Sequence, residues 1–264
     1  MTARRVAVGL LVAIAGIGSI FWAPLFALLL TLVAIVGSVE FAALAKRAGA
    51  GLSLPVALGG CTAYMALAFF QQMYRYEHGL LAMIIVGAIV LGLATGFDHF
   101  GARVGWTVVA TLYLGKLLSY LVVLRQLPNG ERIVLWTVVI VVLTDTVGMA
   151  VGLRYGRAKL WAQLSPAKTW EGAIAAFAVA CGVGTITGTS LLVGVPWGFA
   201  LAFSAIVSLA AQLGDLVESA FKRDARVKDS GEFLGEHGGM LDRFDSYVLV
   251  GAAAYVTLLW SGHL

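Results

Sequence analysis

The chain has 264 residues, of which 60% are hydrophobic and 12% are charged, and its mean hydropathy is +0.92. A soluble domain of this size seldom exceeds about half apolar residues, so the composition excludes an ordinary soluble fold. The net charge is +4 and the pI about 9.2. Basic residues collect in the cytoplasmic loops of membrane proteins, so we expect no nucleic-acid partner. The two cysteines, Cys61 and Cys181, lie inside apolar runs, which indicates buried thiols rather than a disulfide framework or a metal site.

Apolar runs recur along the whole chain with the length, about 20 residues, that a helix needs to cross a bilayer. We therefore predict an all-α, polytopic integral membrane protein that forms a single domain over residues 1–264. Pro24 and Pro196 are expected to separate neighbouring helices. The predicted spans are nine, at 6–23, 25–45, 53–72, 79–97, 104–124, 133–153, 172–193, 197–218 and 244–261. Residues 1–130 are predicted to be mainly scaffold, and residues 140–245 carry the motifs described below.

The distribution of basic residues predicts the orientation. With nine spans and a cytoplasmic N-terminus, fourteen of the 18 Lys and Arg residues fall in cytoplasmic segments. Only Arg75, Arg125 and Arg132 fall outside, and Lys116 lies within the fifth span. This asymmetry follows the positive-inside rule and favours an odd number of spans with the C-terminus outside.

Charged residues inside the spans indicate functional positions, because ionisable groups are costly in hydrocarbon and usually line a cavity or a pathway. Asp145 lies in the inner half of the sixth span, and Asp215 and Glu218 lie at the end of the eighth. We expect a functional role for Asp145 and Asp215. Lys116 in the fifth span has two open interpretations, a functional group or an ion-paired or snorkelling side chain.

A polar segment, SPAKTWEG at 165–172, precedes the seventh span on the predicted cytoplasmic side. One interpretation is structural: Ser165 and Pro166 cap the next helix and Glu171 lies favourably near its N-terminus. The other is functional: Ser165, Lys168 and Thr169 donate to phosphate oxygens. The segment alone does not decide between them.

The densest group of charges in the chain is SAFKRDARVKDSGEFLGEHGGMLDRFD at 219–245. If the eighth span continues as a helix, Asp215 and Lys222 share a face, and Asp242 and Asp245 can share a face at the start of the ninth. Carboxylates from two helix ends are suitable ligands for a hard cation such as Mg²⁺. Four basic side chains would hold phosphate: Lys222, Arg223, Arg226 and Lys228. The Gly-Gly pair after His237 allows close backbone approach to an anion. The alternative is a solvated loop whose acids and bases merely pair.

At these residues the sequence resembles the phosphatidate cytidylyltransferase (CDP-diacylglycerol synthase) family. The matching stretches are SAFKR at 219–223, KDSG at 228–231 and LGEHGGMLDRFD at 234–245. The SPAKTWEG segment and GDLVES at 214–219 are also similar to the family, whereas the first five spans match only in being apolar. The resemblance implies transfer of a cytidylyl group from CTP to phosphatidate, giving CDP-diacylglycerol and pyrophosphate.

We expect the site residues to fall into three groups. The metal group, for Mg²⁺ with a second metal or a monovalent cation left open, is Asp145, Asp215, Asp242 and Asp245. The catalytic group is Lys222, Arg223, Asp229 and His237, the role of His237 being undecided by spacing. The substrate-binding group is Ser165, Lys168, Thr169, Ser219, Lys228, Gly238, Gly239 and Arg243.

The expected partners are CTP, phosphatidate and membrane lipid, with a homodimer left open. We predict a multi-pass protein of the inner (plasma) membrane whose site faces the cytoplasm. Two rival functions remain: a transporter that uses Asp145 and Lys116 in a solute pathway, and a membrane kinase that uses CTP on another lipid such as a polyprenol. No paired broken helices or two-fold repeat support the transporter.

Overall fold

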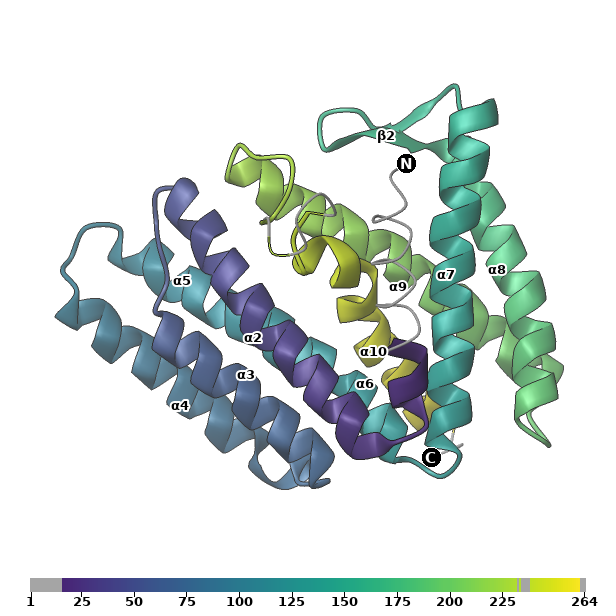
Figure 1. Cartoon of the computed structure of the whole chain (residues 1–264), viewed down its shortest axis with the longest axis horizontal. Helices are drawn as coiled ribbons and strands as arrows, with labels where there is room; N and C mark the ends of the chain where they lie inside the picture. The colour runs from purple at the N-terminus through teal and green to yellow at the C-terminus, as the bar shows by residue number, and fades with distance from the viewer. Residues whose placement is uncertain (1–15, 232, 234–237, 262–264) are drawn as a thin grey trace. The chain divides into compact units, whose positions relative to one another are not determined.

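The computed structural model describes residues 16–231, 233 and 238–261 (Figure 1). The described part is helical apart from one short hairpin. The elements are α2 (Ala23–Arg47), α3 (Leu54–Phe69), α4 (Met73–Ala94), α5 (Phe100–Ala110), the π-helix η1 (Thr111–Leu117), α6 (Leu118–Gln126), α7 (Gly130–Tyr155), β1 (Lys159–Trp161), β2 (Ser165–Thr169), α8 (Trp170–Leu191), α9 (Trp197–Asp224) and α10 (Leu241–Ser261).

Within the described residues, seven helical stretches are long and apolar enough to cross a membrane. They are α2, α4, the continuous stretch Phe100–Gln126, α7, α8, α9 and α10. α3 is also apolar but has only 16 residues. The prediction of an all-α polytopic membrane protein is thereby confirmed. The count of nine and the orientation stay predictions, and most of the first predicted span, 6–23, lies outside the described residues.

The helices are apolar on their outer faces as well as their inner ones. Large apolar side chains such as Leu28, Met83 and Leu201 are at least half exposed, as expected where lipid rather than water surrounds the protein. The helices also differ in how much of their surface is buried. In the most apolar window of α4, 17% of residues are buried, against 61% in Phe100–Gln126. The latter stretch is therefore central to its surroundings and α4 is peripheral.

The helix ends follow local rules. Pro24 stands in the first turn of α2 and Pro196 immediately precedes α9, which confirms both as helix boundaries, since proline lacks the amide hydrogen that a helix interior requires. Lys46 and Arg47 occupy the last turn of α2, where cations interact favourably with the helix dipole.

The described chain divides into two compact units. The first comprises residues 1–126 and 221–244. In it α2 packs against α3 and α6, and α3 packs against α4 and η1. An aromatic cluster holds the last turn of α9 in this unit, because Phe221 lies edge-on to Phe41 at 4.8 Å and near Trp106 and Tyr113. Phe221, just before the cations of the motif, is thus anchored to side chains of α2, α5 and η1.

The second unit comprises residues 127–220 and 245–264, and in it α7 packs along α8, which lies beside it in Figure 1. Trp136 of α7 is fully buried, donates from its indole nitrogen to the Gly184 carbonyl at 2.6 Å and stacks on Phe203 of α9 at 4.0 Å. Gly188 contributes to this contact because a Cβ there would collide with the Trp136 ring.

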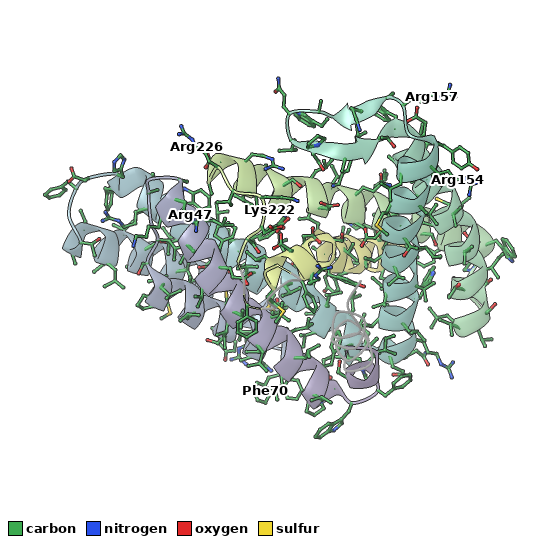
Figure 2. All side chains as sticks on the ribbon, turned by 45° about the horizontal axis from the view of Figure 1, so that its top comes forward. Arg47, Phe70, Arg154, Arg157, Lys222 and Arg226 are labelled. Atoms are coloured by element: carbon green, nitrogen blue, oxygen red, sulfur yellow. The ribbon has the colours of Figure 1, made fainter. Side chains whose placement is uncertain are left out.

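The hairpin β1–β2 is the one departure from all-α structure in the described residues. Lys159 pairs with Thr169 and Trp161 with Ser165 in an antiparallel ladder. It joins α7 to α8. Arg154 stands in the last turn of α7 and Arg157 between α7 and β1 (Figure 2). Neither strand shows a clear alternation of apolar and polar residues, so the sequence did not reveal the hairpin.

The prediction of a single domain stays untested by the division into units.

Candidate functional site

Three carboxylates converge in the second unit. Asp215 and Glu218 come from α9 and Asp245 from α10, and one oxygen of each lies within 4.8 Å of the others. Asp215 and Glu218 are three residues apart, so the helix places both on one face. Glu218 is buried, and Asp215 and Asp245 are half-buried. We call these three residues the carboxylate group.

A glycine allows the two helices to approach at this point. A Cβ built on Gly214 of α9 would lie 2.5 Å from the Asp245 carbonyl oxygen and 3.1 Å from the Ser246 Cα. Both atoms belong to backbone, which cannot rotate out of the way as a side chain can. Gly214 is therefore required for Asp245 to lie next to Asp215.

The hairpin brings a cation to the carboxylate group. Lys168 of β2 lies 2.7 Å from Asp215 Oδ2. The hairpin is held at the start of α8, where the Thr169 side chain accepts a hydrogen bond from the Gly172 amide at 3.2 Å. Glu171 accepts from the Ala158 amide at 3.1 and 3.3 Å. The helix cap is thus Thr169 and not Ser165, which lies in β2, while the expected position of Glu171 in the first turn is confirmed.

Asp145 lies next to the carboxylate group but is not one of its three members. Ser246 connects the two: its hydroxyl donates to Asp145 Oδ1 at 3.3 Å, and its amide donates to Asp245 Oδ1 at 2.7 Å. Asp145 of α7 and Asp245 of α10 thereby lie close together, although they are far apart in the sequence. Assignment of Asp145 as a metal ligand stays a prediction.

The carboxylate group fits a metal ion by the chemistry of its donors. Hard divalent cations take carboxylate oxygens, and a bound cation would relieve the repulsion among like charges that lie this close together. The sequence had predicted Asp215 and Asp245 as metal ligands but assigned no metal role to Glu218. The signal was present, since Glu218 is an acid one helical turn after Asp215.

A different polar cluster lies in the first unit. Both oxygens of Asp242 accept hydrogen bonds: Oδ1 from the Lys222 ammonium at 2.7 Å, and Oδ2 from the Ser230 amide, the Ser230 hydroxyl and the Gly239 amide at 3.0, 2.9 and 2.8 Å. The side chains of Lys222 and Asp242 are only 13% and 11% exposed. Asp242 therefore holds the Lys222 ammonium and the backbone at Ser230 and Gly239 in place. Its role as a metal ligand stays a prediction.

Glu40 completes this cluster from α2. Its carboxylate accepts from the Met240 and Leu241 amides at 2.8 and 2.9 Å and from the Ser230 hydroxyl at 3.2 Å. We call Glu40, Lys222, Ser230 and Asp242 the clamp. Sequence reasoning overlooked Glu40, although an acid inside an apolar span is the signal that had identified Asp145.

The other predicted site residues are distributed over the two units. Arg223 donates to the Val227 carbonyl at 3.0 Å, and Gly238 has a φ of +80°. Asp229, Lys228 and Arg243 are exposed, and Ser219 is buried. His237 lies outside the described residues. The first unit contains Lys222, Arg223, Lys228, Asp229, Gly238, Gly239, Asp242 and Arg243, and the second contains Asp145, Ser165, Lys168, Thr169, Asp215, Ser219 and Asp245.

Lys116, whose role the sequence left open, lies 3.4 Å from Glu77 and the two side chains are 27% and 22% exposed. The ion-pair interpretation is confirmed. Lys116 belongs to η1, and its partner stands in the first turns of α4. Both residues belong to the first unit, and neither is part of the clamp.

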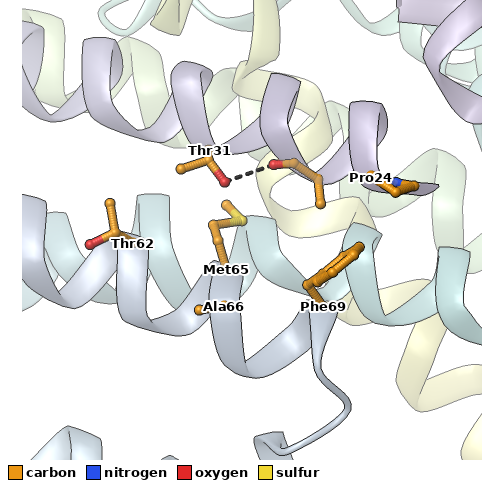
Figure 3. A pocket seen from close by; sticks show the side chains of 7 residues that line it. Pro24, Thr31, Thr62, Met65, Ala66 and Phe69 are labelled. Carbon is orange, nitrogen blue, oxygen red and sulfur yellow. Dashed lines mark hydrogen bonds between the residues drawn. The ribbon is translucent and has the colours of Figure 1, made fainter. Parts of the chain in front are cut away.

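An open hollow of about 300 Å³ lies between α2 and α3 (Figure 3). Its lining carries no charged side chain, and the Thr31 hydroxyl is already bonded to the Ala27 carbonyl at 2.7 Å. It has no group suited to phosphate or metal chemistry, so we do not place the site there. The lining residues are Pro24, Ala27, Thr31, Thr62, Met65, Ala66 and Phe69.

Comparison with known proteins gives a consistent result. A model of the cytidylyltransferase family matches residues 2–260. The chain is 35% identical over 217 residues to the phosphatidate cytidylyltransferase of Bacillus subtilis, covering 78% of this chain and 79% of that protein. It is 35% identical over 169 residues to the enzyme of that name from Mycobacterium bovis, covering 63% of this chain and 54% of that protein. For the Staphylococcus saprophyticus enzyme of that name the identity is 39% over 138 residues, or 52% of each chain.

Proposed function

The chain belongs to the cytidylyltransferase family, and we infer from this membership that it is a phosphatidate cytidylyltransferase, which makes CDP-diacylglycerol from CTP and phosphatidate. The observation that carries the inference is the match to the family over residues 2–260. In addition, the alignment with a relative of that name covers more than two thirds of each of the two chains. The convergence of Asp215, Glu218 and Asp245 supplies the chemistry that such a reaction needs.

The reaction is a nucleotidyl transfer. A phosphate oxygen of phosphatidate forms a bond to the α-phosphorus of CTP while the bond from that phosphorus to the bridging oxygen of the β-phosphate breaks, and pyrophosphate leaves. Little covalent work falls to the protein, because catalysis consists of placing two polyanions in line and stabilising the charge that develops. The apolar helices suit the lipid substrate, whose acyl chains stay in the bilayer.

We assign Mg²⁺ to the carboxylate group, with Asp215, Glu218 and Asp245 as its protein ligands. Mg²⁺ usually takes one or two carboxylates and completes its shell with waters and substrate phosphates, and the three converging carboxylates can supply these protein ligands. Bound there, it would neutralise and orient phosphate oxygens as a Lewis acid. Lys168, 2.7 Å from Asp215, is near enough to share a phosphate with the metal.

The cations of the motif are assigned to phosphate binding. Lys222 is oriented by Asp242 at 2.7 Å, so its ammonium is held in one position rather than left to sample many rotamers. Arg223, Lys228 and Arg243 are further phosphate-contact candidates on the same motif. We propose that these residues face the cytoplasm in the inner (plasma) membrane, as the distribution of basic residues suggests.

The test is pyrophosphate release by purified protein in detergent or lipid, given CTP, phosphatidate and Mg²⁺. We expect release that needs both substrates, stops when a chelator removes the metal and returns when Mg²⁺ is added in excess. The lipid product should be CDP-diacylglycerol. Asp245→Asn, folded and extracted like the wild type, should release pyrophosphate at least about a thousandfold more slowly, a loss of roughly 4 kcal/mol of transition-state stabilisation.

Two results would contradict the proposal. Release of CDP instead of pyrophosphate, with phosphate on another lipid, would identify a kinase. Folded protein that releases nothing, although phosphatidate is accessible to it, would leave transport as the function to test by solute flux.

A further inference from the structure

We propose that Glu40 of α2 is a positioning residue of the cytidylyltransferase reaction, acting through Ser230 and the amides of Met240 and Leu241 on Asp242 and Lys222. The inference rests on the proposed function for its kinetic readout. It gives a part in the reaction to the N-terminal half of the chain, which the sequence had indicated to be mainly scaffold.

The burial of Glu40 is the first argument. Glu40 is 7% exposed in a 25-residue apolar helix. A carboxylate in such a position costs several kcal/mol unless hydrogen bonds compensate, and such residues usually mark functional sites. Here three donors compensate, and all three come from residues 230–241, about 200 positions away in the sequence. Glu40 thus serves the motif rather than its own helix.

The kind of donor explains what Glu40 does to α10. Met240 immediately precedes α10 and Leu241 is its first residue, so their amides belong to the helix start, which has no intrahelical partners. A negative charge at a helix N-terminus is also favoured by the helix dipole. Glu40 therefore caps α10 from another helix and fixes where α10 begins, one residue before Asp242.

Ser230 transmits this position to Asp242. Its hydroxyl lies 3.2 Å from Glu40 Oε2 and 2.9 Å from Asp242 Oδ2, so two carboxylates share one hydroxyl hydrogen. Asp242 in turn holds the Lys222 ammonium at 2.7 Å. The line of contacts Glu40, Ser230, Asp242, Lys222 ends at a cation assigned to substrate phosphate.

Two glycines show that the motif is built around the Glu40 carboxylate. A Cβ on Gly231 would lie 2.8 Å from Glu40 Oε1. A Cβ on Gly239 would lie 2.6 Å from Glu40 Oε2 and would also collide with the Ser230 hydroxyl. Neither position can hold a larger residue while the carboxylate stays where it is.

The experiment compares wild type, Glu40→Gln, Ser230→Ala and the double variant, with Ser38→Ala as the control. Ser38 is buried on the same helix, bonds to the Ala34 carbonyl and contacts Cys61, far from the clamp in its bonding. For each variant kcat, the KM for CTP, the Mg²⁺ half-saturation and the midpoint of thermal unfolding are measured. Glutamine keeps the shape of Glu40 and removes its charge.

We expect Glu40→Gln to lower kcat about 10- to 100-fold, by analogy with the loss of outer residues that orient metal ligands. The Mg²⁺ half-saturation should change less than twofold, because Glu40 is not in the carboxylate group. Because both changes act on one line of contacts, the double variant should lose little more than Glu40→Gln alone. Ser38→Ala should keep the wild-type kcat.

A folded Glu40→Gln enzyme with wild-type kcat, or additive losses in the double variant, would overturn the inference while leaving the function intact. If Glu40→Gln yields no folded protein, Ser230→Ala decides, since wild-type kcat there would also overturn it. If the wild type itself releases no pyrophosphate, the proposed function fails. Hydrogen exchange then decides for Glu40: the Met240 and Leu241 amides should exchange faster in Glu40→Gln than in Ser38→Ala, and unchanged exchange would overturn the positioning role.

Discussion

The carboxylate group and the clamp draw on the same motif but use their acids in opposite ways. In the carboxylate group, Asp215, Glu218 and Asp245 present oxygens to one another within 4.8 Å. In the clamp, Asp242 presents its oxygens to an ammonium, a hydroxyl and two amides. Asp242 and Asp245 stand three residues apart, yet Asp242 accepts four hydrogen bonds from the groups around it, whereas Asp245 lies next to two other carboxylates.

This contrast shows how the environment divides the work among acids of the same kind. A carboxylate whose lone pairs are filled by donors stabilises a loop and orients a cation. Carboxylates that face one another repel, and such an arrangement is useful where a metal ion binds. The comparison predicts that neutralising an acid of the carboxylate group and neutralising Asp242 of the clamp change the enzyme's kinetics in different ways.

The largest effect is expected for the carboxylate group. Asp215→Asn should lower kcat/KM about a thousandfold or more and raise the Mg²⁺ concentration needed for half-maximal activity, because it removes a ligand. Asp242→Asn should lower kcat about a hundredfold without raising the Mg²⁺ requirement, because it frees Lys222 and Ser230. Magnesium titrations of pyrophosphate release measure both.

An Asp242→Asn enzyme whose activity is restored by high Mg²⁺ would break the comparison. It would show that Asp242 is a metal ligand, as the sequence had suggested. Equal Mg²⁺ responses for Asp215→Asn and wild type would contradict the assignment of the carboxylate group instead.

A smaller effect is expected from a change that moves a ligand without removing it. Gly214→Ala introduces a Cβ 2.5 Å from the Asp245 carbonyl, so α9 and α10 must separate there. We expect a roughly tenfold rise in the Mg²⁺ half-saturation and a loss of about 1–3 kcal/mol in stability. Gly198→Ala in the same helix is the control, because nothing lies within 4 Å of its Cβ. Identical Mg²⁺ titrations for the two variants would refute the role of this close approach.

The smallest effect is expected at the ion pair of Lys116 and Glu77. Replacing both by glutamine removes both charges together and avoids an unpaired one in an apolar span. Because neither residue belongs to the carboxylate group or the clamp, kcat should stay within about twofold of the wild type. A loss of activity beyond tenfold in a folded double variant would reopen a functional role for Lys116.

Much of this site could be read from residues because local rules determine it. The i, i+3 spacing of Asp215 and Glu218, the proline at each of two helix starts and the cluster of cations after Phe221 need no knowledge of distant contacts. Lys116 could be narrowed to two interpretations by its position in an apolar run. Its partner Glu77 could not be identified, since a helical pattern does not say which helices are neighbours.

The clamp and the hairpin were beyond such rules. Glu40 joins residues about 200 positions away through hydrogen bonds, and no spacing within the sequence encodes that distance. The strands β1 and β2 have three and five residues, too short for periodicity to distinguish them from a loop. Thr169 rather than Ser165 caps α8 because the hairpin ends there.

The sequence by itself determined the membrane-embedded helical class and the family, and it predicted most of the charged residues that lie in the carboxylate group and the clamp. Composition and motif spacing are local properties, and the bilayer constrains apolar helices whatever their neighbours are. Only the tertiary structure decided which acids face one another and which face donors. That choice depends on where helices cross, and the crossing is set by close contacts such as those of Gly214 and Gly239, which form only when distant segments pack.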